Sequence, residues 1–305
     1  MQKTHSLATA VGCIAIFLWG ILALLSQQAA QFPPFQLLAM CFSIAFIFML
    51  LKWLILGQSI SVLFRQPPIA WLIGTLGLFL YHACYFIALA KAPVLEVSLI
   101  AYLWPLLIVL LSALLPGENL YFKHIVGALV SLLGCWILLG GPQSNFNSDY
   151  LSGYLFAAAC AVIWSCYSVA CRFVKQVPTD AVGLFCAVCA LLGWLCHFYF
   201  ESSYTPDNSA QWLAVLGLGL GPLGLAFFAW DYGIKKGNIQ LLGVLSYATP
   251  LISTLMLITF TNIQASTSIY LACSAIVLGA LIASLQWSDL VLKLSATVSR
   301  FKKAF

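Results

Sequence analysis

Long, uninterrupted apolar runs constrain this chain more than any other feature of its sequence. A helix needs about 20 apolar residues to cross the hydrocarbon core of a bilayer. Ten such segments follow one another, at about residues 8–26, 35–56, 69–89, 94–115, 124–141, 151–172, 180–200, 211–233, 239–260 and 267–287. The runs are continuously apolar and lack the alternation of a membrane β-barrel. The sequence therefore predicts an all-α integral membrane protein with ten transmembrane helices.

The composition excludes a water-soluble fold. Of 305 residues, 63% are hydrophobic and 7% are charged, whereas a soluble domain carries roughly 25% charged residues. The first segment is long and has no small-residue cleavage site, so we expect a retained span and not a signal peptide. The expected partner is the lipid bilayer. Nucleic acid is not expected as a partner, because the basic residues are scattered over loops.

The basic residues are distributed unevenly between the two membrane faces. With the N-terminus placed in the cytoplasm, 12 of the 13 Lys and Arg residues fall on the cytoplasmic side, and Lys91 is the exception. The twelve are Lys3, Lys52, Arg65, Lys123, Arg172, Lys175, Lys235, Lys236, Lys293, Arg300, Lys302 and Lys303. This positive-inside pattern predicts a multi-pass protein with both termini in the cytoplasm.

The two halves of the chain align when the sequence is shifted by 145 residues. The matching pairs include rare residue types: Trp19 and Trp164, Gly74 and Gly219, Lys91 and Lys236, Tyr102 and Tyr247, Pro105 and Pro250, and Gly134 and Gly279. We therefore predict two five-helix repeats, residues 1–145 and 146–305, in one compact transport unit. An odd number of spans inverts the second repeat, and inverted repeats around a central cavity are typical of alternating-access transporters.

The most informative stretch runs from Tyr81 to Pro105 and reads YHACYFIALAKAPVLEVSLIAYLWP. Tyr81, His82 and Tyr85 are three or four residues apart and share one helical face. An ionisable side chain inside a span is costly, so His82 indicates a site for a substrate or a proton. The structural alternative is a neutral imidazole that is bonded to a neighbouring carbonyl or hydroxyl.

Three further aromatic residues, Tyr102, Trp104 and Trp164, lie away from the interfaces where belt aromatics belong. Together with the Tyr81–Tyr85 face they predict an aromatic-walled substrate pocket; the alternative is helix–helix packing. Tyr102 and Trp104 are about 200° apart on a regular helix. Both can face one pocket only if the helix is distorted before Pro105.

Prolines indicate where the spans bend. Pro105, Pro222 and Pro250 each remove a backbone hydrogen bond, which a membrane helix tolerates only where a neighbour or water replaces it. Pro222 lies in an unusually glycine-rich segment, GLGLGPLGLAFFAWDYG. Ser246 precedes Pro250, so its hydroxyl is expected either to contact substrate or to satisfy the kink locally.

Two charged pairs lie near the ends of spans. Asp231 and Lys235 are four residues apart, and we expect a surface ion pair or, alternatively, a gate element. Glu96 with Lys91 is expected to form a similar pair at the outer mouth. Of the eleven cysteines, only Cys186 and Cys189 form a CxxC, and within an apolar helix they are expected to act as small core residues. No metal site and no cofactor are predicted.

The sequence also lacks the motifs of other function classes. It has no Walker A loop, no HExxH and no Ser-His-Asp spacing, so neither an ATP-driven pump nor an enzyme is expected. The expected cavity contains no Arg or Lys, which argues against phosphorylated substrates. The spans lack a chain of carboxylates, which argues against a sodium site or an acidic proton relay.

Three segments carry a resemblance to a known family: FLWG at 17–20, the stretch 81–107, and WSCYSVACRF at 164–173. With its predicted topology, the chain resembles the drug/metabolite transporter superfamily, EamA-type branch, and within it the aromatic amino acid exporters. The resemblance implies ATP-independent export of aromatic amino acids across a bacterial inner membrane, with other amino acids and amphipathic toxic compounds as further candidate substrates. It also implies a central cavity lined by His82, Tyr85, Tyr102, Trp104 and Trp164.

Alternatives remain at this point. A broad drug or cationic-metabolite efflux transporter would have similar composition. An intramembrane enzyme, for example a lipid-modifying one, would require clustered acids or histidines near one interface. Small residues in the fifth span, Gly127, Ser131 and Gly134, and in the tenth suit intramolecular packing and a dimer equally well. The oligomeric state is therefore open, although a monomer would suffice for transport.

Overall fold

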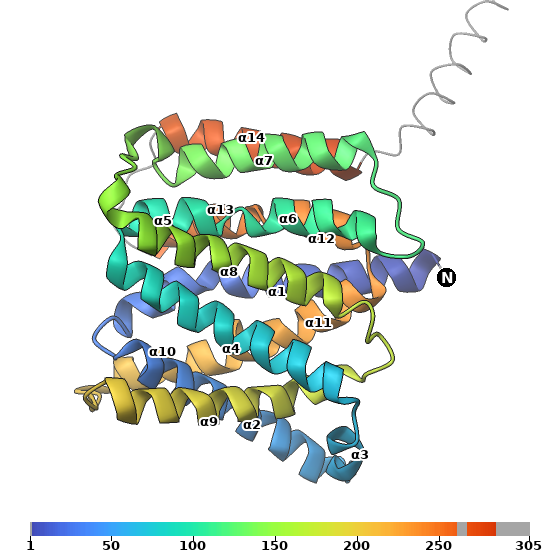
Figure 1. Ribbon diagram of the computed structural model, residues 1–305, viewed down its shortest axis with the longest axis vertical. Helices are drawn as coiled ribbons and strands as arrows, with labels where there is room; N and C mark the ends of the chain where they lie inside the picture. Colours follow the sequence, from blue (N-terminus) through green and yellow to red (C-terminus); the bar gives the residue numbers. More distant parts are fainter. Residues whose placement is uncertain (1, 261–266, 285–305) are drawn as a thin grey trace, which may run out of the picture.

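The computed structural model describes residues 2–260 and 267–284. Throughout these residues the secondary structure is helical, without strands, and the long helices run along one common direction (Figure 1). Within the described part, nine helical stretches are long and apolar enough to cross a membrane, and α7 (Phe122–Leu138) is a shorter tenth apolar helix. The prediction of an all-α membrane protein is confirmed. Lys293, Arg300, Lys302, Lys303 and the expected end of the tenth span, 285–287, lie outside the described residues.

Six spans consist of one continuous helix each, in addition to α7. They are α1 (Gln2–Gln28), α2 (Pro34–Ile55), α4 (Pro68–Lys91), α8 (Leu151–Ala170), α9 (Val182–Phe200) and α14 (Thr267–Ser284). Both α2 and α4 begin with proline at the first helical residue, where the missing N–H would be unpaired in any case. A short helix, α3 (Ile60–Phe64), lies in the loop after α2.

The other three spans are interrupted where prolines predict a bend. The fourth consists of α5 (Val94–Ala101) and α6 (Trp104–Leu111), and the ninth of α12 (Ile239–Leu245) and α13 (Ala248–Phe260). The eighth contains a π-helical turn, Gly221–Leu225, between α10 (Ser209–Leu220) and α11 (Ala226–Lys236). The interruption between α5 and α6 directly precedes Pro105, and a hinge role for the three prolines stays a prediction.

The helices are stacked in a bundle with one pair at each extremity (Figure 1). Helices α7 and α14 pack together at one end of the stack, and α2 packs with α9 at the other. Between them, α1 packs against α11 and α13, while α8 packs against α4 and against α5 and α6. The two outer pairs join equivalent spans of the two sequence halves, and the packing of α1 against α11 and α13 corresponds to that of α8 against α4 and against α5 and α6, as in a two-repeat transporter fold.

Helices α7 and α14 approach each other through small residues. Gly127, Gly134 and Gly279 lie in the contact, and the Ser131 hydroxyl donates to the Ile276 carbonyl oxygen at 3.3 Å. A Cβ atom added at Gly279 would lie 2.2 Å from Ser131 Oγ and 2.4 Å from the Gly127 carbonyl oxygen. The small-residue faces of the fifth and tenth spans thus pack against each other within one chain.

The N-terminus and α3 lie at the same end of the bundle (Figure 1). Lys52 at the end of α2 forms an ion pair of 2.8 Å with Asp180, which lies between α8 and α9. Arg172 and Lys235 are joined at this end as well, since an Arg172 N–H donates to the Lys235 carbonyl oxygen. We call this the basic end of the bundle, and the opposite end the distal end.

We expect Gly279→Ala to lower the melting temperature of the purified protein. Alanine favours a helix more than glycine does, but the added methyl group would overpack the α7–α14 contact, at a cost of about 1–3 kcal/mol. The control is Ser274→Ala, on an exposed face of the same helix. Thermal unfolding in detergent measures the difference, and equal melting temperatures for the two variants would contradict the close contact.

Candidate functional site

Four tryptophans from four helices meet in the interior of the bundle: Trp19 in α1, Trp104 in α6, Trp164 in α8 and Trp230 in α11. The Trp19 ring centroid lies 6.2 Å from that of Trp104, 5.5 Å from Trp164 and 5.1 Å from Trp230. The contacts with Trp104 and Trp164 are edge-to-face, an arrangement that aromatic quadrupoles favour. We call these four residues the tryptophan cluster.

Hydrogen bonds fix the orientation of the tryptophan cluster. The Trp19 indole donates to the Pro222 carbonyl oxygen at 3.1 Å, and the Trp230 indole donates to Ser168 Oγ at 3.0 Å. On the backbone side, the Ser165 hydroxyl donates to the Trp104 carbonyl oxygen at 2.9 Å. Trp19 thereby links the cluster to the π-helical turn of the eighth span.

His82 and two tyrosines of α4 border the cluster. The ring of Tyr81 lies 5.2 Å from that of Trp164 and 5.1 Å from that of His82, and Tyr85 stacks on Tyr81. The carbonyl oxygen of Leu78 accepts from His82 Nδ1 at 2.7 Å, which leaves Nε2 as the second polar atom of the ring. The three side chains are only partly buried, so the cluster does not cover them completely.

Five of the seven residues that we predicted for substrate binding are thus brought together: Tyr81, His82, Tyr85, Trp104 and Trp164. Two cluster members were missing from that set, although a sequence signal existed for one of them. Trp19 matches Trp164 at the repeat offset, whereas Trp230 aligns with Tyr85 and shows no such identity. Phe227 also joins the group, with its ring 6.0 Å from His82.

Tyr102 and Ser246 are not among the rings in contact with the tryptophan cluster, although the Tyr102 hydroxyl is close enough to those of Tyr81 and Tyr85 to interact with them electrostatically. Tyr102 packs beside Val109, Cys135 and Tyr247 in a second apolar core. Ser246 is fully buried, and its hydroxyl donates at 2.7 Å to the Leu242 carbonyl oxygen, which also accepts from the Ser246 N–H. The hydroxyl is therefore bonded within its own helix. Although the fourth span is broken before Pro105, Tyr102 and Trp104 belong to different cores. A binding role for Tyr102 or Ser246 stays a prediction.

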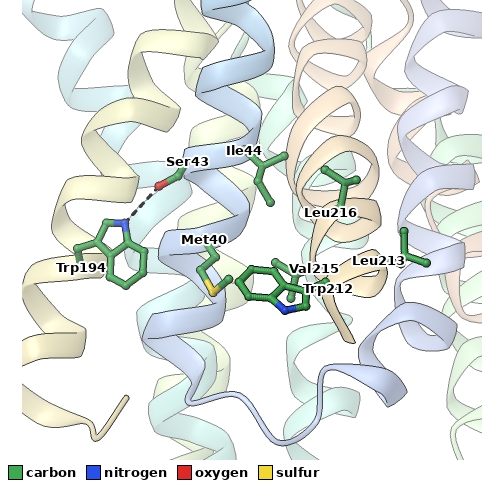
Figure 2. A pocket seen from close by; sticks show the side chains of 8 residues that line it. All are labelled: Met40, Ser43, Ile44, Trp194, Trp212, Leu213, Val215 and Leu216. Atoms are coloured by element: carbon green, nitrogen blue, oxygen red, sulfur yellow. Dashed lines mark hydrogen bonds between the residues drawn. The ribbon is translucent and has the colours of Figure 1, made fainter. Parts of the chain in front are cut away.

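Two hollows lie elsewhere in the described part of the chain. A groove of about 400 Å³ between α2, α9 and α10 is lined by Met40, Trp194 and Trp212 among others, and Figure 2 shows Trp194 bonded to Ser43 beside it. A second hollow, of about 530 Å³, is lined by Tyr102, Leu132 and Trp136 among others. Both include exposed apolar side chains, as expected of surfaces in contact with lipid.

The expected surface ion pair of Asp231 and Lys235 is wrong in its location. The pair exists, with an Nζ–Oδ1 distance of 2.8 Å, but the two residues are only 2% and 4% exposed. Their helix, α11, lies in the interior against α1, so the face that carries both residues is covered by neighbouring segments. They cannot be classed with solvated surface charges.

The expected pairing of Glu96 with Lys91 is also wrong. Lys91 is exposed at the end of α4, whereas Glu96 is buried, and no ion pair joins them among the residues described. Instead, one carboxylate oxygen of Glu96 accepts from the backbone N–H of Asn145 at 2.9 Å. Glu96 therefore holds the linker between the two halves and does not pair with the lysine.

The cluster offers stacking surfaces with a few polar atoms and no charged side chain. Aromatic faces hold an aromatic or aliphatic group by dispersion and edge-to-face contacts, and they also attract a cation. His82 and the tyrosine hydroxyls can orient a polar end of such a ligand. In residues 2–260 and 267–284, no three His, Cys, Asp or Glu side chains are grouped so that they could hold a metal ion.

Comparisons with known proteins agree on one family. The model of the EamA-like transporter family matches residues 6–140 and 151–285. The aromatic amino acid exporter YddG of Ancylobacter novellus is 49% identical over 284 residues, which are 92% of this chain and 98% of that protein. YddG of Salmonella typhimurium is 29% identical over 266 residues, 82% of this chain and 87% of the relative. A solved crystal structure that is 49% identical superposes with a TM-score of 0.86, covering 91% of this chain and 97% of the other.

We expect Trp230→Phe and Ser168→Ala each to lower stability, because each leaves one buried polar group without its partner. The cost of such an orphaned group is about 1–3 kcal/mol. The double variant removes both partners, so its loss should be clearly smaller than the sum of the two single losses. Thermal unfolding measures all three variants.

Trp212→Phe serves as the control for this cycle, since Trp212 is 52% exposed and lies in the lipid-facing groove. Its melting temperature should match that of the unmodified protein. Strictly additive losses at Trp230 and Ser168 would show that the hydrogen bond between them contributes nothing.

Proposed function

Because this chain belongs to the EamA-like transporter family, we propose that it exports aromatic amino acids from the bacterial cytoplasm by alternating access. The observation that carries the proposal is the meeting of Tyr81, His82, Tyr85, Trp104 and Trp164 beside two further tryptophans in the bundle interior. The names of relatives that are 49% and 29% identical support the same substrate class.

The chemistry of the cluster suits an aromatic amino acid. Trp104 and Trp164 provide faces and edges against which a phenyl or indole side chain can pack. His82 Nε2 and the hydroxyls of Tyr81 and Tyr85 would orient the amino and carboxylate groups of the substrate. The absence of charged residues from these positions favours a net-neutral zwitterion over a phosphorylated or strongly anionic compound.

We propose that the substrate occupies a central cavity beside this cluster, between two oppositely oriented repeats, residues 1–145 and 146–305. The interrupted spans would supply the bending: the breaks next to Pro105 and Pro250 and the π-helical turn at Pro222. Such interruptions need little rearrangement to change a helix axis. The positive-inside distribution supports a cytoplasmic basic end in the inner membrane, with both termini on that side.

We propose a transporter and not an enzyme. The site consists of aromatic rings, hydroxyls and one imidazole, which bind and orient a ligand but provide no nucleophile paired with a base. No ATP-binding loop occurs in the sequence, so the export would be driven by substrate or ion gradients. The aromatic faces would also accept a hydrophobic cation, and a substrate panel separates this alternative.

The test is counterflow of labelled phenylalanine and tryptophan in proteoliposomes, with and without a pH gradient. We expect uptake to exceed that of empty liposomes, and Trp164→Ala to reduce it at least about tenfold, equivalent to about 1.4 kcal/mol. His82→Ala should reduce it as well. Leucine and a hydrophobic quaternary ammonium compound complete the substrate panel.

Trp212→Ala is the matched control, because it removes an indole from the lipid-facing groove and not from the cluster. Its counterflow should be unchanged. If Trp164→Ala and His82→Ala both transport normally while folded, the binding site lies elsewhere. Counterflow of the quaternary ammonium compound alone would replace the amino acid proposal with drug efflux.

A further inference from the structure

The buried pair of Asp231 and Lys235 is tied to a neighbouring segment of the chain. The Thr179 hydroxyl donates to Asp231 Oδ2 at 2.7 Å, and Lys235 Nζ donates to the Val177 carbonyl oxygen at 3.1 Å. Both partners lie in the connection between α8 and α9. The ion pair itself belongs to one helix, whereas these two bonds cross from α11 to another segment.

Arg172, at the end of α8, extends this set of bonds. Its guanidinium donates to the carbonyl oxygens of Lys235 and Gly237, at 3.3 and 2.5 Å, and forms an ion pair of 3.0 Å with Glu118. The second Glu118 oxygen accepts from the Gln240 side chain at 3.1 Å. The bonds therefore join the ends of α8 and α11, the start of α12 and the loop before α7.

This set of bonds closes the basic end beneath the tryptophan cluster. From Trp230 towards that end, Asp231, Ile234 and Lys235 are all buried. At the distal end, by contrast, the bonds among Gln36, Glu201 and Tyr204 join α2 and α9 to the loop before α10. These bonds do not include residues of α4, α6 or α8, which carry the proposed site.

We propose that Asp231, Lys235, Thr179 and Arg172 form an ionic seal that closes the basic end of the substrate path and separates when that end opens. This inference rests on the proposed transport function. In the closed state the charges are desolvated and depend on each other. Opening breaks the bonds to Thr179 and Val177, while the ion pair stays on α11. Water then hydrates both charges, and the free energy of hydration offsets the loss of the two bonds.

The seal predicts opposite effects for single and double substitutions. Asp231→Asn leaves the Lys235 charge buried without its counterion, a strongly unfavourable state that hydration on opening relieves. The double variant Asp231→Asn/Lys235→Met has no charge to hydrate. A neutral pair of similar volume is commonly tolerated in a buried site, so the double variant should favour the closed state.

Cys171 is a natural reporter for this test. It is 3% exposed and adjoins Arg172, so a water-soluble maleimide reaches it only when the seal separates. The protein is alkylated in proteoliposomes, and peptide mass spectrometry measures the alkylation rate of each cysteine. We expect Asp231→Asn to raise the Cys171 rate at least about tenfold. The free energy that corresponds to a tenfold change is a small part of the free-energy cost of leaving a buried charge unpaired. The double variant should return the rate to that of the unmodified protein.

Two controls make the result specific. Arg65→Met removes an exposed positive charge in the loop after α2, and it should leave the Cys171 rate unchanged. Cys41 and Cys160, buried in the core, should stay protected in every variant. Their alkylation in parallel with Cys171 would indicate general loosening and overturn the seal, as would a double variant that reacts as fast as Asp231→Asn.

The readout does not depend on the substrate. If aromatic amino acids fail in counterflow while the alkylation pattern appears as expected, the substrate proposal falls and the seal stands. If counterflow succeeds and Cys171 stays protected in Asp231→Asn, the seal falls and the transport proposal stands.

Discussion

The fold depends on one constraint: a backbone N–H or C=O group in the hydrocarbon core of a bilayer must find a partner within the protein, or it costs several kcal/mol. Continuous helices meet it by themselves, but the spans with Pro105, Pro222 and Pro250 do not. At two of these breaks a side chain from a distant part of the chain bonds to the backbone. The Tyr247 hydroxyl accepts from the Leu106 N–H, and the Trp19 indole donates to the Pro222 carbonyl oxygen. An interrupted helix is thus stable here because side chains of neighbouring helices bond to its backbone.

Because of this constraint, one of the helix interruptions is hydrogen-bonded directly to the candidate site. Trp19 packs against three other tryptophans and at the same time satisfies the π-helical turn of the eighth span. A ligand that moves the Trp19 ring therefore changes the hydrogen bond that supports the turn. In a low-dielectric interior that bond is worth more than it would be in water. In the proposed transport cycle, substrate contact and helix bending would be coupled through the Trp19 indole, without any change in charge.

Much of this arrangement could be predicted from the sequence, because membrane helices leave few choices. The apolar runs specified the spans, the prolines marked the breaks, and the Tyr81–Tyr85 spacing placed those side chains on the face that meets Trp164. Two features could not be predicted. An Asp and a Lys four residues apart near a helix end look the same whether exposed or buried, and the partners of Asp231 and Lys235 lie more than fifty residues away. Likewise, the break before Pro105 was foreseen, but the direction in which it turns Tyr102 depends on packing against Val109 and Cys135.

The two halves of the chain differ in charge where the seal lies, and this difference has an energetic consequence. Shifted by 145 residues, Asp231 corresponds to Phe86 and Lys235 to Ala90, both apolar. Two halves with identical side chains would give closed states of equal free energy at the two ends. Here the basic end is held by desolvated charges and crossing hydrogen bonds, whereas the equivalent positions of α4 can contribute only dispersion and apolar burial. Because charge desolvation and apolar burial respond differently to water entry, the proposed seal would make the two closed states differ in stability before any substrate binds. A repeat protein of this kind can therefore have a preferred resting orientation that is set by two side chains of one helix.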